Sequence, residues 1–199
     1  MREGAVLLRM LLVAALALVA GAAAAADFKI QAWSFDMDAP GSLPSGFAAG
    51  NRNGASGRWE VKADPQSSSP PHVLARIPLG SSDMGPQVIF LDGIEATNLD
   101  MTVRIKAVSS EDGQGGGVVF RAEDERNYYV VWISLQEKLI RIDRIVNGEV
   151  KPLQDLSVGT LEAGKWHTLR LTIRSSELEA IFDNRHLISA REKAWEFGR

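Results

Sequence analysis

The chain has 199 residues, a formal net charge of −3 at pH 7 and no cysteine. A fold that depends on disulfides is therefore excluded. The absence of a basic excess, with lysines and arginines scattered rather than grouped in stripes, argues against nucleic acid as a partner.

The first 26 residues have the pattern of a secretory signal peptide. Arg2 and Arg9 flank the start of an apolar run over residues 10–19, which is followed by the alanine-rich segment 22–26. The apolar run is too short for a membrane-spanning helix, which needs roughly 20 residues. We therefore expect cleavage after residue 26, no stable membrane insertion afterwards, and a periplasmic or secreted protein.

Residues 27–199 are long enough for one domain, and we expect a single one. Its first part, from Pro40 to Pro71, is rich in Gly, Ser, Asn and Pro and is predicted to form loops around one short strand at Trp59 to Lys62. We interpret this part as the rim of the domain rather than as a linker.

Four later segments alternate apolar and polar residues with a period of two. They are Leu99–Ala107, Leu139–Val146, Trp166–Arg174 and Leu178–Phe182. Such alternation predicts strands with one face in a core and one in water. Several short strands at this spacing predict an all-β fold, a two-sheet antiparallel β-sandwich.

Two further segments, Val118–Phe120 and Tyr128–Leu135, are apolar on both faces. This is typical of central strands that are covered on each side, or of strands whose outer face lines a groove. Turn signals separate the strands: the glycine-rich run Asp112–Gly117, Asn147–Gly148, which tolerates the positive φ of a type I′ hairpin, and Asp183–Asn184. We interpret the glycine run as a loop before a strand.

Several of these segments together resemble a known bacterial family. They are Gly116–Ala122 with Asp124, Asn127–Val131, Asn147–Gly148 and Trp166–Leu169, with Trp33–Asp36 and Leu43–Phe47 in the N-terminal half. On these residues the chain is similar to the 3-keto-disaccharide hydrolase domain family. That family is a secreted branch of the concanavalin A-like lectin and glucanase superfamily, related to laminin G-like jelly rolls. The resemblance implies a concanavalin A-like jelly roll and a carbohydrate or glycoside as partner.

The resemblance is incomplete at the C-terminus. A domain of this kind would be expected to finish with a Gly-rich strand and an aromatic-Asp-Asp strand, whereas this sequence stops at Trp195–Arg199. We therefore expect the C-terminal strand to be missing and the first strand to lack a neighbour. Superfamily members often hold calcium beside that last strand, so a structural calcium is possible but not readable here. No other cofactor is expected.

A ligand groove is predicted on the strand that follows residue 127. Tyr128 and Trp132 share a face by the period of two, about 13 Å apart, and could stack on the apolar faces of sugar rings. Arg121 and Asn127 nearby could donate hydrogen bonds to hydroxyl groups, with Asp124 as an acceptor. In the alternative interpretation the two aromatic residues belong to the core, and Arg121 and Asp124 form a salt bridge that fixes the turn.

Catalytic residues cannot be assigned from the sequence. Glu177 and Glu179 lie two apart on a predicted strand, within the range of a glycosidase pair, but the surrounding face is polar and such pairs usually face solvent. The E-x-D-x-E pattern of related glucanases and the G-x-S-x-G nucleophile elbow are both absent. His72, His167 and His186 lack the spacing of metal ligands, so no metal site is expected.

Three functions remain open. The first is a carbohydrate-binding sandwich that holds a glycan across a concave sheet face. The second is an enzyme of the resembled family, a hydrolase or lyase that cleaves the glycosidic bond of a 3-keto-sugar by elimination. The third is a laminin G-like interaction module with no sugar ligand.

Overall fold

The computed structural model describes residues 30–52, 55–56, 58–67, 69–78, 87–108 and 115–193. The expected signal peptide, residues 1–26, and the C-terminal segment 195–199 lie outside these ranges. The chain divides into a short unit, Met1–Trp33, and a main unit, Ser34–Arg199, which contains every strand discussed below. Within the described ranges, no helix is both long and apolar enough to cross a membrane.

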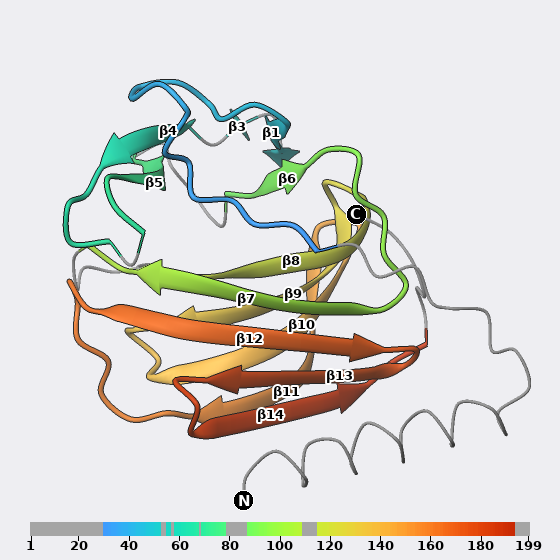
Figure 1. Ribbon diagram of the computed structural model, residues 1–199. Coiled ribbons are helices and arrows are strands. Elements are labelled where there is room, and N and C mark those ends of the chain that lie inside the picture. Colours follow the sequence, from blue (N-terminus) through green and yellow to red (C-terminus); the bar gives the residue numbers. More distant parts are fainter. Residues whose placement is uncertain are drawn as a thin grey trace, which may run out of the picture. The chain divides into compact units, whose positions relative to one another are not determined.

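Two four-stranded antiparallel sheets form the body of the main unit (Figure 1). Sheet I has the strand order β11-β10-β9-β8, with β8 (Gly115–Asp124), β9 (Asn127–Ser134), β10 (Leu139–Val146) and β11 (Glu149–Ser157). Sheet II has the order β14-β13-β12-β7, with β7 (Leu99–Lys106), β12 (Trp166–Arg174), β13 (Glu177–Phe182) and β14 (His186–Arg191). The predicted two-sheet antiparallel β-sandwich is confirmed.

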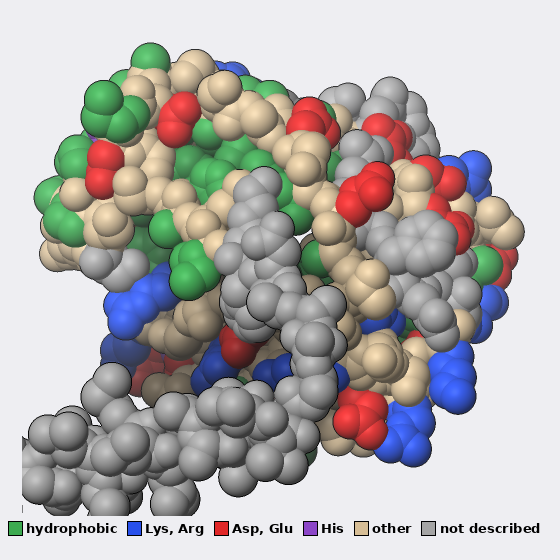
Figure 2. Space-filling model, turned by 45° about the vertical axis from the view of Figure 1, so that its right-hand side comes forward, with side chains coloured by type: hydrophobic (Ala, Val, Ile, Leu, Met, Phe, Trp, Pro, Cys, Tyr) green, Lys and Arg blue, Asp and Glu red, His purple; other side chains and the backbone are tan. Residues whose placement is uncertain are grey.

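The N-terminal part of this unit adds three two-stranded ribbons, which lie above β7 and β8 in Figure 1. They pair β1 (Phe47–Ala49) with β6 (Ile89–Leu91), β2 (Asn51–Arg52) with β3 (Ala55–Ser56), and β4 (Arg58–Ala63) with β5 (His72–Ile77). Figure 2 shows hydrophobic side chains most densely over the upper part of the molecule, at the height of these ribbons in Figure 1. In β1, β4, β5 and β6 the buried residues are Val61 and Phe90, and Met37 and Leu43 are exposed beside these strands.

The core lies between the inner faces of the two sheets. Side chains from both sheets form one buried cluster that includes Phe120, Tyr129, Ile142, Leu171 and Phe182. A second, smaller cluster lies on the other face of sheet I, which we call its outer face. Burial of apolar side chains at alternate positions of each strand therefore produces the period of two seen in the sequence.

Most predicted strands are confirmed with small changes of boundary. β10 and β12 coincide with the predicted segments, and Asn147 and Gly148 both have positive φ in the hairpin between β10 and β11. One prediction is corrected, because Gly115 to Gly117 begin β8 rather than forming a loop before it.

Seven strands were not anticipated: β1, β2, β3, β5, β6, β11 and β14. The expectation of a single short strand between Pro40 and Pro71 is therefore corrected. The reason is clearest for β11, whose pairing with β10 shifts register between Ile142 and Asp143, so that alternation fails at Leu153. Pro152 lies in the same strand, which is tolerated because β11 is at the edge of sheet I.

The outer face of sheet II carries many charged residues. Arg170 donates two hydrogen bonds to Asp100, with N–O distances of 3.0 and 2.7 Å, and Arg191 pairs with Glu177. The hydrogen bond from Arg170 lowers the pKa of Asp100 below its usual value. These are solvated cross-strand pairs, which contribute little to stability.

Candidate functional site

The outer face of sheet I carries a row of four residues, one from each strand. The register places Gly117 opposite Trp132, Trp132 opposite Arg141, and Arg141 opposite Asp155. The next row along the sheet on the same face places Val130 opposite Asp143. An aromatic ring, a guanidinium and two carboxylates are thereby brought together by strand pairing alone.

The indole of Trp132 is held in place from two sides. Its Nε1–H donates a hydrogen bond to Oδ2 of Asp143 at 2.7 Å. The guanidinium carbon of Arg141 lies 5.4 Å from the centroid of the Trp132 ring, a cation–π distance. Arg141 is in turn paired with Glu137, with an N–O distance of 3.7 Å. The ring is partly exposed and has a defined orientation.

Glycine at position 117 means that β8 places no side chain opposite Trp132. A Cβ atom at this position would lie 2.0 Å from the carbonyl oxygen of Val131 and 2.6 Å from Cα of Trp132. Only glycine therefore allows β8 to approach β9 this closely. Gly115 meets the same constraint one row further along the same face.

Asp143 is buried, and only one of its two carboxylate oxygens has a hydrogen-bond partner among the described residues. It is 2% exposed, and its Oδ1 has no hydrogen-bond partner within the described part of the chain. Burial raises the pKa of Asp143, and this effect outweighs the hydrogen bond from Trp132 and the attraction of Arg141. A buried carboxylate with a raised pKa is costly for the fold and is common at functional sites.

We expect Asp143→Asn to raise the free energy of unfolding at pH 7 by about 1 kcal/mol, because an amide costs less to bury than an ionised carboxylate. A carboxyl whose pKa is raised on folding stabilises the protein below its unfolded pKa and loses that contribution as the pH rises through the folded pKa. The advantage of the variant should therefore shrink as the pH falls toward 3.8, the ordinary value. Urea unfolding at several pH values measures this difference in the free energy of unfolding between the variant and the wild type. A variant less stable than the wild type at pH 7 would contradict this account.

The second apolar cluster covers the other half of the same outer face. Val88 and Phe90, next to or within β6, pack with Tyr128 and Ile145 of sheet I. Tyr128 is only 1% exposed as a result. The predicted face shared by Tyr128 and Trp132 exists, but Tyr128 is buried in it and Trp132 is partly exposed.

Arg121 lies inside the protein. It is therefore not at the ligand groove, where it was predicted to donate hydrogen bonds to a sugar. It is 2% exposed, has a φ of 48°, and donates hydrogen bonds to the carbonyl oxygens of Thr97, at 2.9 Å, and Ser175. The pairing of β8 with β9 is irregular between Phe120 and Asp124, and this irregularity turns the side chain toward sheet II. Arg121 therefore links β8 to the loop before β7 and to the β12–β13 turn.

Asp124 and Asn127 organise two neighbouring turns. Nδ2 of Asn127 donates to both carboxylate oxygens of Asp124, at 3.0 and 2.9 Å, and Oδ1 of Asn127 accepts from the backbone of Asn147 at 2.9 Å. Burial acts to raise the pKa of Asp124, but hydrogen bonds from Asn127 and from the backbone of Arg126 and Asn127 outweigh it, and the pKa is lowered. The alternative of an Arg121–Asp124 salt bridge is replaced by these contacts.

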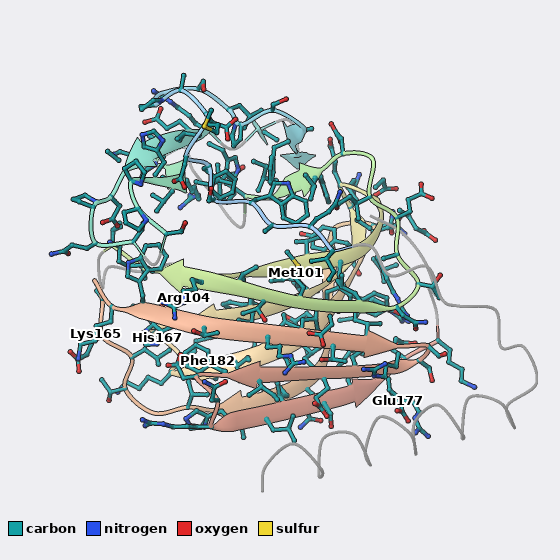
Figure 3. All side chains as sticks on the ribbon, viewed as in Figure 1. Met101, Arg104, Lys165, His167, Glu177 and Phe182 are labelled. Atoms are coloured by element: carbon teal, nitrogen blue, oxygen red, sulfur yellow. The ribbon has the colours of Figure 1, made fainter. Side chains whose placement is uncertain are left out.

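The other candidate residues do not form a site together. Figure 3 shows His167 and Glu177 at opposite ends of sheet II. His167 lies on the inner face, where its Nδ1 is 2.7 Å from Oδ2 of Asp183 and its ring packs on Phe182. Glu177 and Glu179 are exposed on the outer face. In the described ranges no three His, Asp or Glu side chains are grouped as metal ligands.

Three residues of the site were not predicted: Arg141, Asp143 and Asp155. Arg141 and Asp143 appeared only as the polar side of an alternating strand. The position of Arg141 could have been predicted. The turn between the predicted strands Tyr128–Leu135 and Leu139–Val146 is short, so the two strands form a hairpin. This hairpin places Arg141 opposite Trp132. Asp155 could not be placed from the sequence, because the bulge in β11 interrupts the alternation that would assign its side chain to one face of the sheet.

Comparison with one solved structure supports the fold. The carbohydrate-binding module CBM66 from Bacillus subtilis is similar, with a TM-score of 0.62, 15% identity, and coverage of 77% of this chain and 83% of that one. Sheep galectin-11 in complex with glycerol matches with a TM-score of 0.40 and 11% identity, over 51% of this chain and 76% of that one. No family model matches the sequence, and no curated protein matches it significantly. The resemblance to the 3-keto-disaccharide hydrolase family therefore stays a prediction.

Proposed function

We propose that the protein binds a carbohydrate on the outer face of sheet I, with the ring of Trp132 as the surface on which a sugar stacks. The observation that carries this proposal is the partly exposed indole, fixed by Asp143 and flanked by a glycine. A sugar ring presents apolar C–H groups that pack on an aromatic plane, and a fixed ring loses little conformational freedom on binding.

Polar groups that can bind sugar hydroxyls surround this ring. Arg141 provides N–H donors, and the exposed carboxylate of Asp155 opposite it provides acceptors. A few polar groups around an apolar surface are typical of small-ligand sites. The fold similarity to a carbohydrate-binding module agrees with this assignment.

The test is glycan binding by Trp132→Ala. We expect its affinity to fall at least tenfold, because the stacking surface is lost and about 1.4 kcal/mol corresponds to a factor of ten. Trp166→Ala is the matched control, since Trp166 is also partly exposed and lies under a cation, Lys106, but belongs to sheet II. Isothermal titration calorimetry with the glycans that bind on an array gives both values.

Unchanged affinity in Trp132→Ala would refute the stacking surface. If the wild-type protein bound no glycan at all, the third hypothesis, an interaction module without a sugar ligand, would replace carbohydrate binding.

A second candidate is cleavage of a 3-keto-glycoside, as the resemblance in the sequence implies. The observation that favours it is Asp143, whose buried carboxyl with a raised pKa is suited to general acid or base chemistry. Asp143→Asn separates the two candidates, because it keeps an acceptor for Trp132 but cannot transfer a proton. An enzyme would lose turnover of a 3-keto-glycoside in this variant, whereas a binding protein would show none before the change.

Export is part of the proposal. A glycan ligand is consistent with a periplasmic or secreted location, which rests on the predicted signal peptide. An exported protein that starts at Asp27 in intact-mass analysis would support it, and retention of the leader would contradict it.

A further inference from the structure

We infer that the site on sheet I selects neutral glycans against acidic ones, and that Asp155 determines this selectivity. The inference rests on the proposed carbohydrate binding and extends it to the class of ligand. Its basis is the balance of charge around Trp132.

The charged groups that act on Asp143 are Arg141, Glu137 and Asp155. Together with Asp143 itself, they place three carboxyl groups around a single guanidinium. A uronate, sulfate or sialate at the Trp132 ring would therefore meet more negative than positive charge. Like charges brought together in a partly desolvated site disfavour binding, and proteins use such repulsion to exclude wrong ligands.

Arg141, the cation that acts on Asp143 among the described residues, is already engaged. Arg141 is paired with Glu137 at 3.7 Å and lies over the Trp132 ring at 5.4 Å. Its neighbour on the other side in the sheet is Asp155. A ligand carboxylate that recruited Arg141 would have to replace these contacts and would still face the acids left behind. Neutral hydroxyl groups can instead donate to the carboxylates and accept from Arg141 without adding charge.

The structure brings Asp155 to this face by an irregularity. The register shift in β11 places Pro152 opposite Asp143 and Asp155 opposite Arg141. Pro152 and Asp155 are three apart in sequence, yet they occupy neighbouring positions on the same face of the sheet. A regular strand would turn residues three apart to opposite faces. Bulges of this kind redirect side chains at functional sites.

The excess of acidic over basic groups is found at the site on sheet I and not on the outer face of sheet II. The outer face of sheet II carries more basic than acidic residues: Arg104, Lys106, Arg170, Arg174 and Arg191 against Asp100, Glu177 and Glu179. The chain as a whole has a net charge of only −3. The sign of charge at the proposed site is thus opposite to that of the other exposed sheet face.

The experiment compares matched neutral and acidic glycans. The probes are oligosaccharides of glucose, galactose and mannose, and oligosaccharides of equal length made of glucuronic, galacturonic and mannuronic acid. Affinities are measured at low and at physiological salt for the wild type, Asp155→Lys and Glu179→Lys. The last is the matched control, because it makes the same charge change at an exposed position of sheet II.

We expect the wild type to prefer the neutral member of any bound pair by about tenfold, more at low salt than at physiological salt, since salt screens exposed charges. Asp155→Lys should reduce this preference about tenfold, and Glu179→Lys should not. Circular dichroism confirms that each variant is folded.

Three outcomes would overturn the inference. Equal or tighter binding of the acidic member by the wild type would do so while leaving carbohydrate binding intact. An unchanged preference in Asp155→Lys would remove the assigned role of Asp155. Binding of no member of either set would reject this inference, whereas the proposed function is rejected only if the wild type also binds no glycan on the array.

Discussion

Arg121→Met is expected to lower the free energy of unfolding by about 3 kcal/mol, because two carbonyl groups would lose a charged donor that is itself buried. These are the carbonyl oxygens of Thr97 and Ser175. For a domain of this size, that loss corresponds to a decrease in Tm of about 6 to 12 °C. Methionine fills much of the same space, so the loss reports the hydrogen bonds rather than a cavity.

The matched control for this variant is Arg126→Met. Arg126 is exposed and donates to the carbonyl oxygen of Asn147 at 2.6 Å. Its loss should cost under about 1 kcal/mol, since water can replace an exposed donor. Glycan affinity should be unchanged in both variants. Reduced affinity in a stably folded Arg121→Met would instead support the ligand-binding role predicted from the sequence.

Gly117→Ala is expected to lower the free energy of unfolding by about 3 kcal/mol and to weaken glycan binding. The new Cβ would lie 2.0 Å from the backbone oxygen of Val131 and 2.9 Å from Cβ of Trp132. Since the closest atoms belong to the backbone of β9, relief requires the pairing of β8 with β9 to shift. That shift would displace Trp132, beside which the new methyl group would lie.

Gly93→Ala serves as the comparison for this variant. A Cβ at Gly93 would meet no atom within 4 Å, so only its φ of 74° makes the change unfavourable. A cost of about 1 kcal/mol with normal glycan affinity is expected. Urea unfolding and calorimetry give both quantities. If Gly117→Ala behaved like Gly93→Ala, the close approach of β8 to β9 would not restrict the site.

The fold could be predicted because buried apolar residues alternate with polar residues along its regular strands. β10 and β12 have the predicted boundaries, since Ile140, Ile142, Leu169 and Leu171 alternate with polar residues along regular strands. The irregular strand β11 and the short strand β6 carry too little alternation to be recognised. Local patterns therefore sufficed for the sandwich but not for the elements at its edge and on its outer face.

The candidate site could be predicted only in part. Trp132 and the face it shares with Tyr128 followed from the period of two, but the covering of Tyr128 depends on Phe90, which is distant in sequence. The inward turn of Arg121 depends on its positive φ, which the alternation of β8 does not indicate. Asp143 became a candidate only once its burial was known, together with the lack of a partner for its Oδ1 among the described residues.

Pro152 and the bulge beside it also affect how copies of the protein meet. An edge strand with regular, unpaired N–H and C=O groups can pair with the edge of another molecule and begin a growing assembly. In β11, proline removes one donor and the extra residue breaks the spacing of the rest. Copies of the protein would therefore stay separate along this edge, and Asp155 beside it would remain accessible to the proposed ligand.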